Sequence, residues 1–368
     1  MTVDFLFDFL SELLSDLIGS GPVLFISMLI PCLMLFGFIT IYALIVIYAE
    51  LKVSSFIQDK VGPMGQGVGL HAGKWGLLQP IADALKLLLK EDIIPSSADR
   101  PLFILAPFMI FIGAFISFVA LPFGESIIVA DLNIGLFYIL GVGSIAVLSL
   151  ILAGWSSNNK WSLYGGMRSA AQIVSYEIPA GLSLIVVIML AGTLNMQDII
   201  KYQMGGMFSW ILFDNPFVPI AFVVYFISAI AETNRTPFDL PESESELVAG
   251  FATEYSGMRY AFFFLSEYAN MFVVSAVAAA CFLGGWHSPI SGFIDSPAWG
   301  VFWMISKTFF LIFIMIWLRW TLPRLRVDQL MNVCWKVFFR VALINIFGVA
   351  IWTVVFNELG KSYETIFY

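Results

Sequence analysis

Eight long apolar segments run through this sequence, and they constrain its fold more than any other feature. They lie at about 22–49, 102–122, 134–157, 178–194, 216–232, 260–284, 299–320 and 338–357. A helix needs roughly 20 apolar residues to cross the hydrocarbon core of a bilayer, and each segment is near that length. The pattern therefore predicts an all-α integral membrane protein with about eight transmembrane helices.

The composition also favours a membrane protein over a soluble one. Of the 368 residues, 60% are hydrophobic and only 12% are charged, against roughly 25% charged in a typical soluble domain. A soluble fold of this length could not bury so much apolar surface. The formal net charge of −8 disfavours a nucleic-acid partner, because phosphate binding depends on Lys and Arg.

Two further segments are predicted to be amphipathic helices rather than membrane spans. Residues 3–18 place acids and serines opposite Phe, Leu and Ile, which is typical of a helix on the membrane surface. This segment has no basic start and no small-residue cleavage site, so it does not fit a signal peptide. Residues 76–90 place Asp83, Lys86 and Lys90 opposite a leucine-rich stripe. That helix could seal the bundle, or it could cover an entrance for a lipid-soluble substrate.

The basic residues are distributed asymmetrically, and the asymmetry predicts the orientation. Fifteen of the 18 Lys and Arg residues fall in or beside the loops after the first, third, fifth and seventh spans. Because inner loops are enriched in Lys and Arg, we expect these loops on the cytoplasmic or matrix side and both termini opposite. A bacterial inner membrane is expected in preference to a mitochondrial or thylakoid membrane.

No resident redox cofactor is expected on this chain. An iron–sulfur cluster usually takes four cysteine ligands, whereas this chain has only Cys32, Cys281 and Cys334, which are far apart in sequence. The predicted topology places His71 and His287 on opposite membrane faces, so they cannot share a haem. No Gly-rich dinucleotide fingerprint and no metal-ligand spacing is visible. If the chain serves redox chemistry, the electrons must be carried by another chain.

Acidic residues are concentrated in one segment, from 232 to 267. They are Glu232, Asp239, Glu242, Glu244, Glu246, Glu254 and Glu267, and only Arg235 and Arg259 lie among them. Glu242 and Glu244 fit a helix start, where acids face the positive end of the helix dipole. Glu267 does not, because it lies about 10 Å inside an apolar span. An ionised acid near the membrane centre costs on the order of 2.5–3.5 kcal/mol. Glu267 inside its span, together with Glu177 and Glu232 beside neighbouring spans, therefore predicts a hydrated cavity or a proton path.

In this acidic segment the sequence resembles the H-type membrane subunit of respiratory complex I, NADH:quinone oxidoreductase. The matching residues read AETNRTPFDLPE at 231–242, ESELVAGF at 244–251 and Glu254-Tyr255. Four more stretches agree, and they lie at 76–91, 154–160, 167–177 and 317–330. The similarity runs from about Glu50 to Lys336.

The resemblance implies a function and a set of site residues. The family subunit forms part of the access tunnel for the quinone substrate, and its buried acids link that tunnel to the proton-pumping membrane arm. The implied proton-coupling residues are Glu177, Glu232, Asp239, Glu242, Glu244, Glu246, Glu254 and Glu267. The implied tunnel and inner-face residues are Glu50, Lys52, Asp83, Lys86, Lys90, Glu91, Arg168, Arg235, Arg319, Arg324 and Arg326. No residue is expected to be catalytic by itself. The expected partners are other membrane-arm subunits and the iron–sulfur and quinone-site subunits of the peripheral arm, and iron–sulfur clusters and FMN are expected on partner subunits and not on this chain.

Two departures from the family pattern lie near the implied quinone entrance. The family usually reads Glu-Arg-Lys where this chain has Glu50-Leu51-Lys52, and the Gly-rich stretch from Gly62 to Gly76 is about six residues longer than usual.

Two other functions compete with the complex I subunit. One is a membrane subunit of a related membrane-bound hydrogenase, which uses no quinone. The other is a secondary transporter with a carboxylate ion site. Transporters often contain inverted repeats, and no internal repeat is visible in this sequence. The nearly unbroken match from 231 to 255 favours the complex I subunit.

Overall fold

The structure, a computed structural model, describes residues 20–60, 62–63, 76–240, 244–290 and 297–367. These residues form helices and turns without a strand, so the predicted all-α membrane fold is confirmed. Seven helices in this part of the chain are long and apolar enough to cross a membrane. They are α2 (Ser20–Ile57), α4 (Arg100–Ser117), α5 (Gly135–Ser156), α6 (Lys160–Ala191), α11 (Gly257–Phe282), α12 (Pro297–Thr321) and α14 (Phe339–Phe367). An eighth apolar helix, α9 (Val218–Glu232), has 15 residues.

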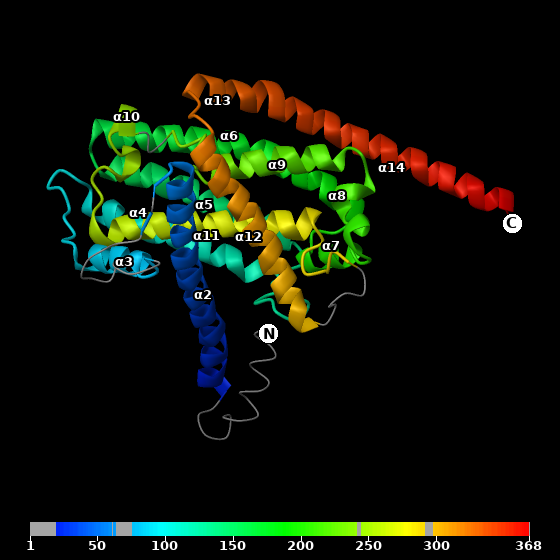
Figure 1. The fold of residues 1–368 in the computed structure, drawn as a ribbon, viewed down its shortest axis with the longest axis horizontal. Helices are drawn as coiled ribbons and strands as arrows, with labels where there is room; N and C mark the ends of the chain where they lie inside the picture. Colours follow the sequence, from blue (N-terminus) through cyan, green and yellow to red (C-terminus); the bar gives the residue numbers. More distant parts are fainter. Residues whose placement is uncertain (1–19, 61, 64–75, 241–243, 291–296, 368) are drawn as a thin grey trace.

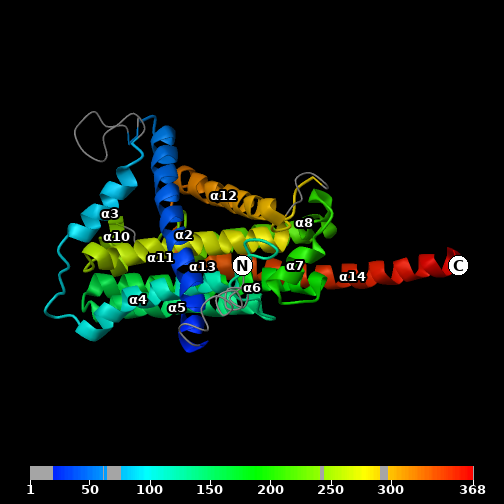
Figure 2. The same cartoon turned by 90° about the horizontal axis from the view of Figure 1, so that it is seen from below.

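The predicted N-terminal helix at 3–18 lies outside the described residues. The predicted amphipathic helix at 76–90 corresponds to α3 (Gln79–Leu89). Before α14, the chain passes through α13 (Val327–Val333) and a π-helical turn, η4 (Cys334–Phe338). α14 packs against α6 and α9 and then extends beyond the rest of the bundle (Figures 1 and 2).

The long helices form a bundle with a distinct structure at each end. α4, α5, α6, α9 and α11 run side by side, and α2 crosses them at a steep angle in both views (Figures 1 and 2). α3 and the short α10 (Glu244–Leu247) lie at one end, which we call the inner end because it carries the predicted inner loops. The short helices α7 (Met196–Tyr202) and α8 (Ile211–Asp214) lie at the other, outer end.

α11 lies at the centre of the bundle because its sequence is apolar on every side. All residues from Met271 to Phe282 are buried, and α11 packs against α2, α4, α9 and α12. Alanines at 276 and 278–280 let neighbouring backbones approach closely, as is typical of helix interfaces in membranes. A helix that is apolar all round is buried, unlike one with a single apolar stripe. The inner half of α11 therefore carries Glu267 and Asn270 into the interior of the protein.

α6 is longer than the sequence predicts. The sequence predicts a span at 178–194 after a polar loop, but the structure has one helix of 32 residues. Asn159 caps its start by accepting a hydrogen bond from a backbone N–H two residues on, at 3.0 Å. The first half of α6 is rich in Gly and Ser, which are weak helix formers, but it packs against α5 and η3 (Gly250–Ala252). Packing outweighs propensity here, so Arg168 and Glu177 lie on a helix and not in a loop.

A buried lysine fixes the outer end of α11. The Nζ of Lys307 on α12 donates to the carbonyls of Leu283, Gly285 and His287 at 2.6, 2.9 and 2.7 Å. The Nζ also lies 4.4 Å from the centroid of the Trp210 ring, a favourable cation–π distance. Three hydrogen bonds offset the cost of burying this charge, and the negative end of the α11 dipole stabilises it further.

Close backbone contact attaches η3 to α6. A Cβ atom on Gly165 would lie only 2.5 Å from the backbone N of Phe251, so a larger residue does not fit there. Ser162, one turn earlier on α6, donates to the carbonyl of Phe251 at 2.9 Å. These two contacts hold the segment that carries Glu254 and leads into α11.

We predict that Gly165→Ala lowers the stability of the folded chain. The added methyl group would force η3 away from α6, and overpacking of this kind costs about 1–3 kcal/mol. The measurement is the midpoint of thermal unfolding of the detergent-purified complex that contains the chain. Gly181→Ala on the same helix is the control, because no atom lies within 4 Å of a Cβ there. An unfolding midpoint that is equal in the two variants would contradict the prediction.

Candidate functional site

Arg235 joins two carboxylates inside the protein. It follows α9 and is only 3% exposed. Its Nε lies 2.7 Å from Oε1 of Glu267 on α11, and its Nη1 lies 3.2 Å from Oε2 of Glu50 on α2. The guanidinium also lies over the ring of Tyr268, 4.3 Å from the ring centroid. One cation thus links two helices to the segment after α9.

Glu50 has two further hydrogen-bond donors. The hydroxyl of Tyr268 donates to its Oε2 at 2.8 Å, and Arg319 near the end of α12 donates to its Oε1. Glu50 is only 6% exposed, so these groups stabilise its charge in place of water. Breaking a buried ion pair leaves an unpaired charge and costs about 3–5 kcal/mol. We call these five residues the ion-pair cluster: Glu50, Arg235, Glu267, Tyr268 and Arg319.

Two more acids lie on adjacent helices. Glu177 on α6 accepts a hydrogen bond from the hydroxyl of Ser144 on α5 at 2.6 Å. Glu232 is the last residue of α9, and its carboxylate is close enough to Glu177 for the two charges to repel each other. α6 and α9 pack against each other, which brings together two acids that are distant in sequence.

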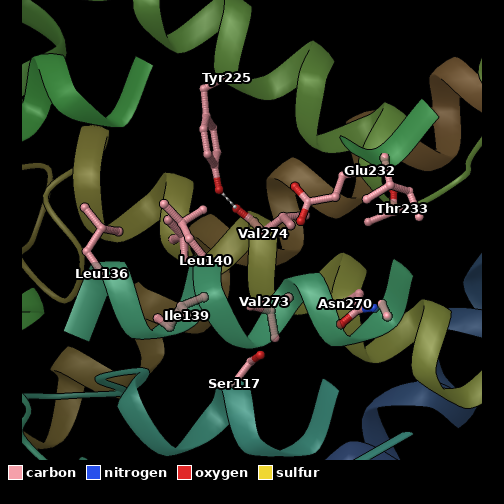
Figure 3. A pocket seen from close by; sticks show the side chains of 14 residues that line it. Ser117, Leu136, Ile139, Leu140, Tyr225, Glu232, Thr233, Asn270, Val273 and Val274 are labelled. Atoms are coloured by element: carbon pink, nitrogen blue, oxygen red, sulfur yellow. Dashed lines mark hydrogen bonds between the residues drawn. The ribbon is translucent and has the colours of Figure 1, made fainter. Parts of the chain in front are cut away.

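Two small cavities adjoin Glu232. The first offers about 40 Å³ to the centres of water molecules, and Figure 3 shows Glu232 and Asn270 among its lining side chains. The second offers about 30 Å³ and is lined by Glu232, Glu267 and Asn270. A single water needs roughly 10–15 Å³ of such space. The second cavity therefore connects the ion-pair cluster to Glu232 through a space that suits water.

Two predicted acids form ion pairs at the inner end of the bundle. Arg168 contacts Glu246 at 2.6 Å, and both side chains are partly exposed. Arg324, which is also partly exposed, contacts the buried Asp239 at 2.9 Å. Exposed pairs are worth only about 0–1 kcal/mol. These contacts fasten the acidic segment to α6 and to the loop after α12, but they are not part of the ion-pair cluster.

Glu254 is held by the start of α6. It accepts a hydrogen bond from the side chain of Asn159 at 2.6 Å. The neighbouring Tyr255 stacks on Phe103 with ring centroids 4.1 Å apart and donates to the Phe103 carbonyl at 3.3 Å. Burial raises the pKa of Tyr255 to about 12, so its hydroxyl keeps its proton. Glu254 thus lies in a packed region beside α4 and α6, apart from the ion-pair cluster.

The other predicted residues lie on α3, at the end of α2 and after α12. Asp83 and Lys86 form a pair at 3.6 Å on α3, and Lys52 lies over the ring of Tyr48 at 5.6 Å. Three predicted residues are exposed at the inner end, and they are Lys90, Glu91 and Arg326. Glu242, the side chain of Glu244, and residues 64–75 of the Gly-rich stretch lie outside the described part of the chain.

Several uncharged residues of the site are not singled out by the sequence. Tyr268, Ser144 and Asn270 each lie in an apolar span, where one neutral polar residue is a weak signal. The available signal for Asn270 is its spacing, because a residue three positions after Glu267 lies on the same helix face. One charged residue, Asp92, is also not singled out by the sequence, and it pairs with Arg259 at 3.1 Å.

The cysteines do not gather in the fold. Cys281 and Cys334 are buried, Cys32 is exposed, and Sγ of Cys334 donates to the carbonyl of Ser175 at 3.0 Å. In the part of the chain that the structure describes, no three His, Cys, Asp or Glu side chains are placed to hold a metal ion. The polar groups of the site are therefore carboxylates, guanidinium groups, hydroxyls and amides.

These observations define a class, the multi-pass helical membrane proteins that hold paired acids and water-sized cavities within the bundle. Comparison with known proteins narrows the class. The family model of NADH dehydrogenase matches residues 30–350. The chain is similar to the NADH-quinone oxidoreductase H subunit of Chlorobaculum tepidum, with 54% identity over 328 residues, 86% of this chain and 90% of the relative.

A second relative gives the same result. An H subunit of the NADH-quinone oxidoreductase of Geobacter sulfurreducens is 47% identical over 351 residues, 90% of this chain and 96% of the relative. The chain therefore belongs to the NADH dehydrogenase family, among the H subunits of NADH-quinone oxidoreductase. The resemblance found in the acidic segment is confirmed.

We predict that Arg235→Met destabilises the protein by about 3–5 kcal/mol, because Glu267 then loses its cation in a low-dielectric site. The double variant Arg235→Met with Glu267→Gln should recover part of this loss, as expected for a direct pair in a double-mutant cycle. The measurement is thermal unfolding of the purified complex. Arg168→Met is the matched control, because its partly exposed pair should be worth less than about 1 kcal/mol. Equal losses for the two Arg variants would contradict the prediction.

Proposed function

We propose that this chain is a membrane subunit of a proton-pumping NADH:quinone oxidoreductase, in which it lines part of the quinone access route and carries an acidic path for protons. One observation carries the proposal: Arg235 contacts both Glu50 and Glu267, and a cavity links Glu267 to Glu232. Ionisable side chains within membrane spans are costly, and those that are retained usually serve ion or proton movement.

The acids form an ordered series from the inner end into the bundle. Glu50 and Glu267 both pair with Arg235. When one of the two acids is protonated, Arg235 therefore remains ion-paired with the other. Glu232 lies across the second cavity from this pair. Glu232 in turn interacts electrostatically with Glu177 on α6. Protonation at one acid thus changes the charge balance at the next.

The quinone route is proposed to begin beside α3. This helix exposes apolar side chains such as Leu88 and Leu89 at the inner end, whereas Asp83 and Lys86 lie on its polar face. An amphipathic helix at the membrane surface suits contact with lipid-like molecules, among them the tail of a quinone. α3 packs against α2 and α11, the helices that carry Glu50 and Glu267. A quinone guided by α3 would arrive near the ion-pair cluster.

Partner subunits complete the proposed activity. The electrons are expected to come from partners that carry iron–sulfur clusters and FMN, and the membrane-arm partners would continue the proton path. The related hydrogenase and the secondary transporter receive less support, because relatives that cover most of this chain are named as NADH-quinone oxidoreductase subunits. Those relatives are bacterial, which favours a bacterial membrane.

We predict that an affinity-tagged copy of this chain co-purifies with iron–sulfur and other membrane-arm subunits in mild detergent. The measurement is mass spectrometry of the purified material, with an unrelated tagged multi-pass protein as the control. Recovery of a stable, lone chain that moves ions in liposomes would instead favour the transporter.

We predict that Glu232→Gln and Glu267→Gln each lower coupled quinone reduction about tenfold or more, since relay groups that bind and release protons contribute rate factors of this size. The measurement is NADH-driven quinone reduction and proton uptake in proteoliposomes, after the subunit composition has been checked. Asp198→Asn is the control, because Asp198 forms an exposed pair with Lys201 near the outer end, at 3.8 Å. Wild-type rates and pumping in both Gln variants would refute the acidic path.

A further inference from the structure

Asn270 lies where the two cavities beside Glu232 meet. It is on α11, one turn after Glu267, and it lines both cavities, as do Glu232 and Ala146. Figure 3 shows Asn270 below Glu232, with Val273 and Val274 of the same helix nearby. Glu267 lines only the second cavity. Asn270 therefore stands beside both acids and within the space that connects them.

The carboxamide of Asn270 faces the cavities and not the protein. Within the described residues it makes no hydrogen bond to another side chain or to the backbone. The neighbouring polar groups use their bonds locally: Thr233 donates to the carbonyls of Ala229 and Ile230 at 3.2 and 3.1 Å. Asn270 is partly buried, and a buried amide without a partner costs about 1–3 kcal/mol, so a water in either cavity would be a favourable partner for its carboxamide.

The size of the cavities fits this interpretation. They offer about 40 and 30 Å³ to water centres, room for roughly two or three waters each. A carboxamide has two donors and an acceptor with two lone pairs, so it can orient waters on both sides. It does not titrate and cannot itself carry a proton at working pH.

We infer that Asn270 positions a short water chain through which protons pass between Glu267 and Glu232. This inference rests on the acidic path proposed above and names a residue that sets one of its steps. In that step the O–H bond of protonated Glu267 breaks and its proton joins the first water. A proton moves along the chain, and the last water gives one to the carboxylate of Glu232. One proton is transferred in total, and Asn270 is a positioning residue that remains neutral throughout.

The test compares Asn270→Thr with Asn270→Val in the assembled complex. The two side chains have the same shape and differ in one hydroxyl, so packing changes are matched. We expect the Thr variant to keep at least about half of the coupled quinone reduction, and the Val variant to lose about tenfold. The KM for quinone should stay unchanged in both, because the change lies away from the inner end. Ser275→Ala is the control, since Ser275 lies on the same helix and contacts Met315 of α12 instead, at 3.7 Å.

A second variant tests the same space without touching Asn270. Ala146→Val adds two methyl groups to the wall that both cavities share, so it should exclude water and reproduce the loss of coupled activity. Equal activity of the Thr and Val variants overturns the inference, as does wild-type activity of Ala146→Val. If Glu232→Gln in the same preparation is also fully active, the acidic path itself is wrong. If Glu232→Gln is inactive while the Asn270 and Ala146 variants give one of these overturning results, the acidic path stands and only the role of Asn270 is rejected.

Discussion

A charge within a membrane protein has to be paired, and in this chain that requirement centres on Arg235. Its guanidinium contacts Glu50 and Glu267 and covers Tyr268, so α2, α11 and the segment after α9 must meet at one point. Arg319 adds α12 through Glu50. An uncompensated charge in such a place costs several kcal/mol. α2 crosses the bundle steeply (Figure 1), and near its inner end Glu50 contacts the buried cation.

The second water-sized cavity borders the same cluster through Glu267. α11 is buried from Met271 outward, although Val273, Val274 and Val277 still line the first cavity. One turn further in, Glu267 and Asn270 border the second cavity with Glu232. At the outer end, Lys307 binds three carbonyls after α11. Two buried cations thus hold α11, Arg235 through Glu267 in its inner half and Lys307 just beyond its outer end, and the first water-sized cavity lies along the helix between these contacts. Under the proposed function, protons would move beside α11 between these two contacts.

The sequence predicts the membrane class and most of the charged residues of the site, because both follow from hydropathy and from charge in an apolar context. It does not predict which charged side chains pair with each other. Arg235 pairs with Glu267 of its own acidic segment, but its second partner, Glu50, comes from the first span. Arg168 and Glu177 read as loop residues, because Gly and Ser lower helix propensity, although packing makes that stretch helical. Asn270 and Lys307 depend on tertiary contacts that local patterns do not encode.

The size of the cavities limits how quinone chemistry can reach the inner acids. The space beside Glu232 suits a few waters, and a quinone headgroup is several times larger than a water molecule. If quinone is reduced near the inner end, its effect on Glu232 must travel as charge or as protons and not by contact. A unit charge about 10 Å away is worth roughly 1.7 kcal/mol at an effective dielectric of about 20. That energy changes a protonation equilibrium constant more than tenfold. Under the proposed function, Arg235, held between two carboxylates, would pass such a change in charge onward.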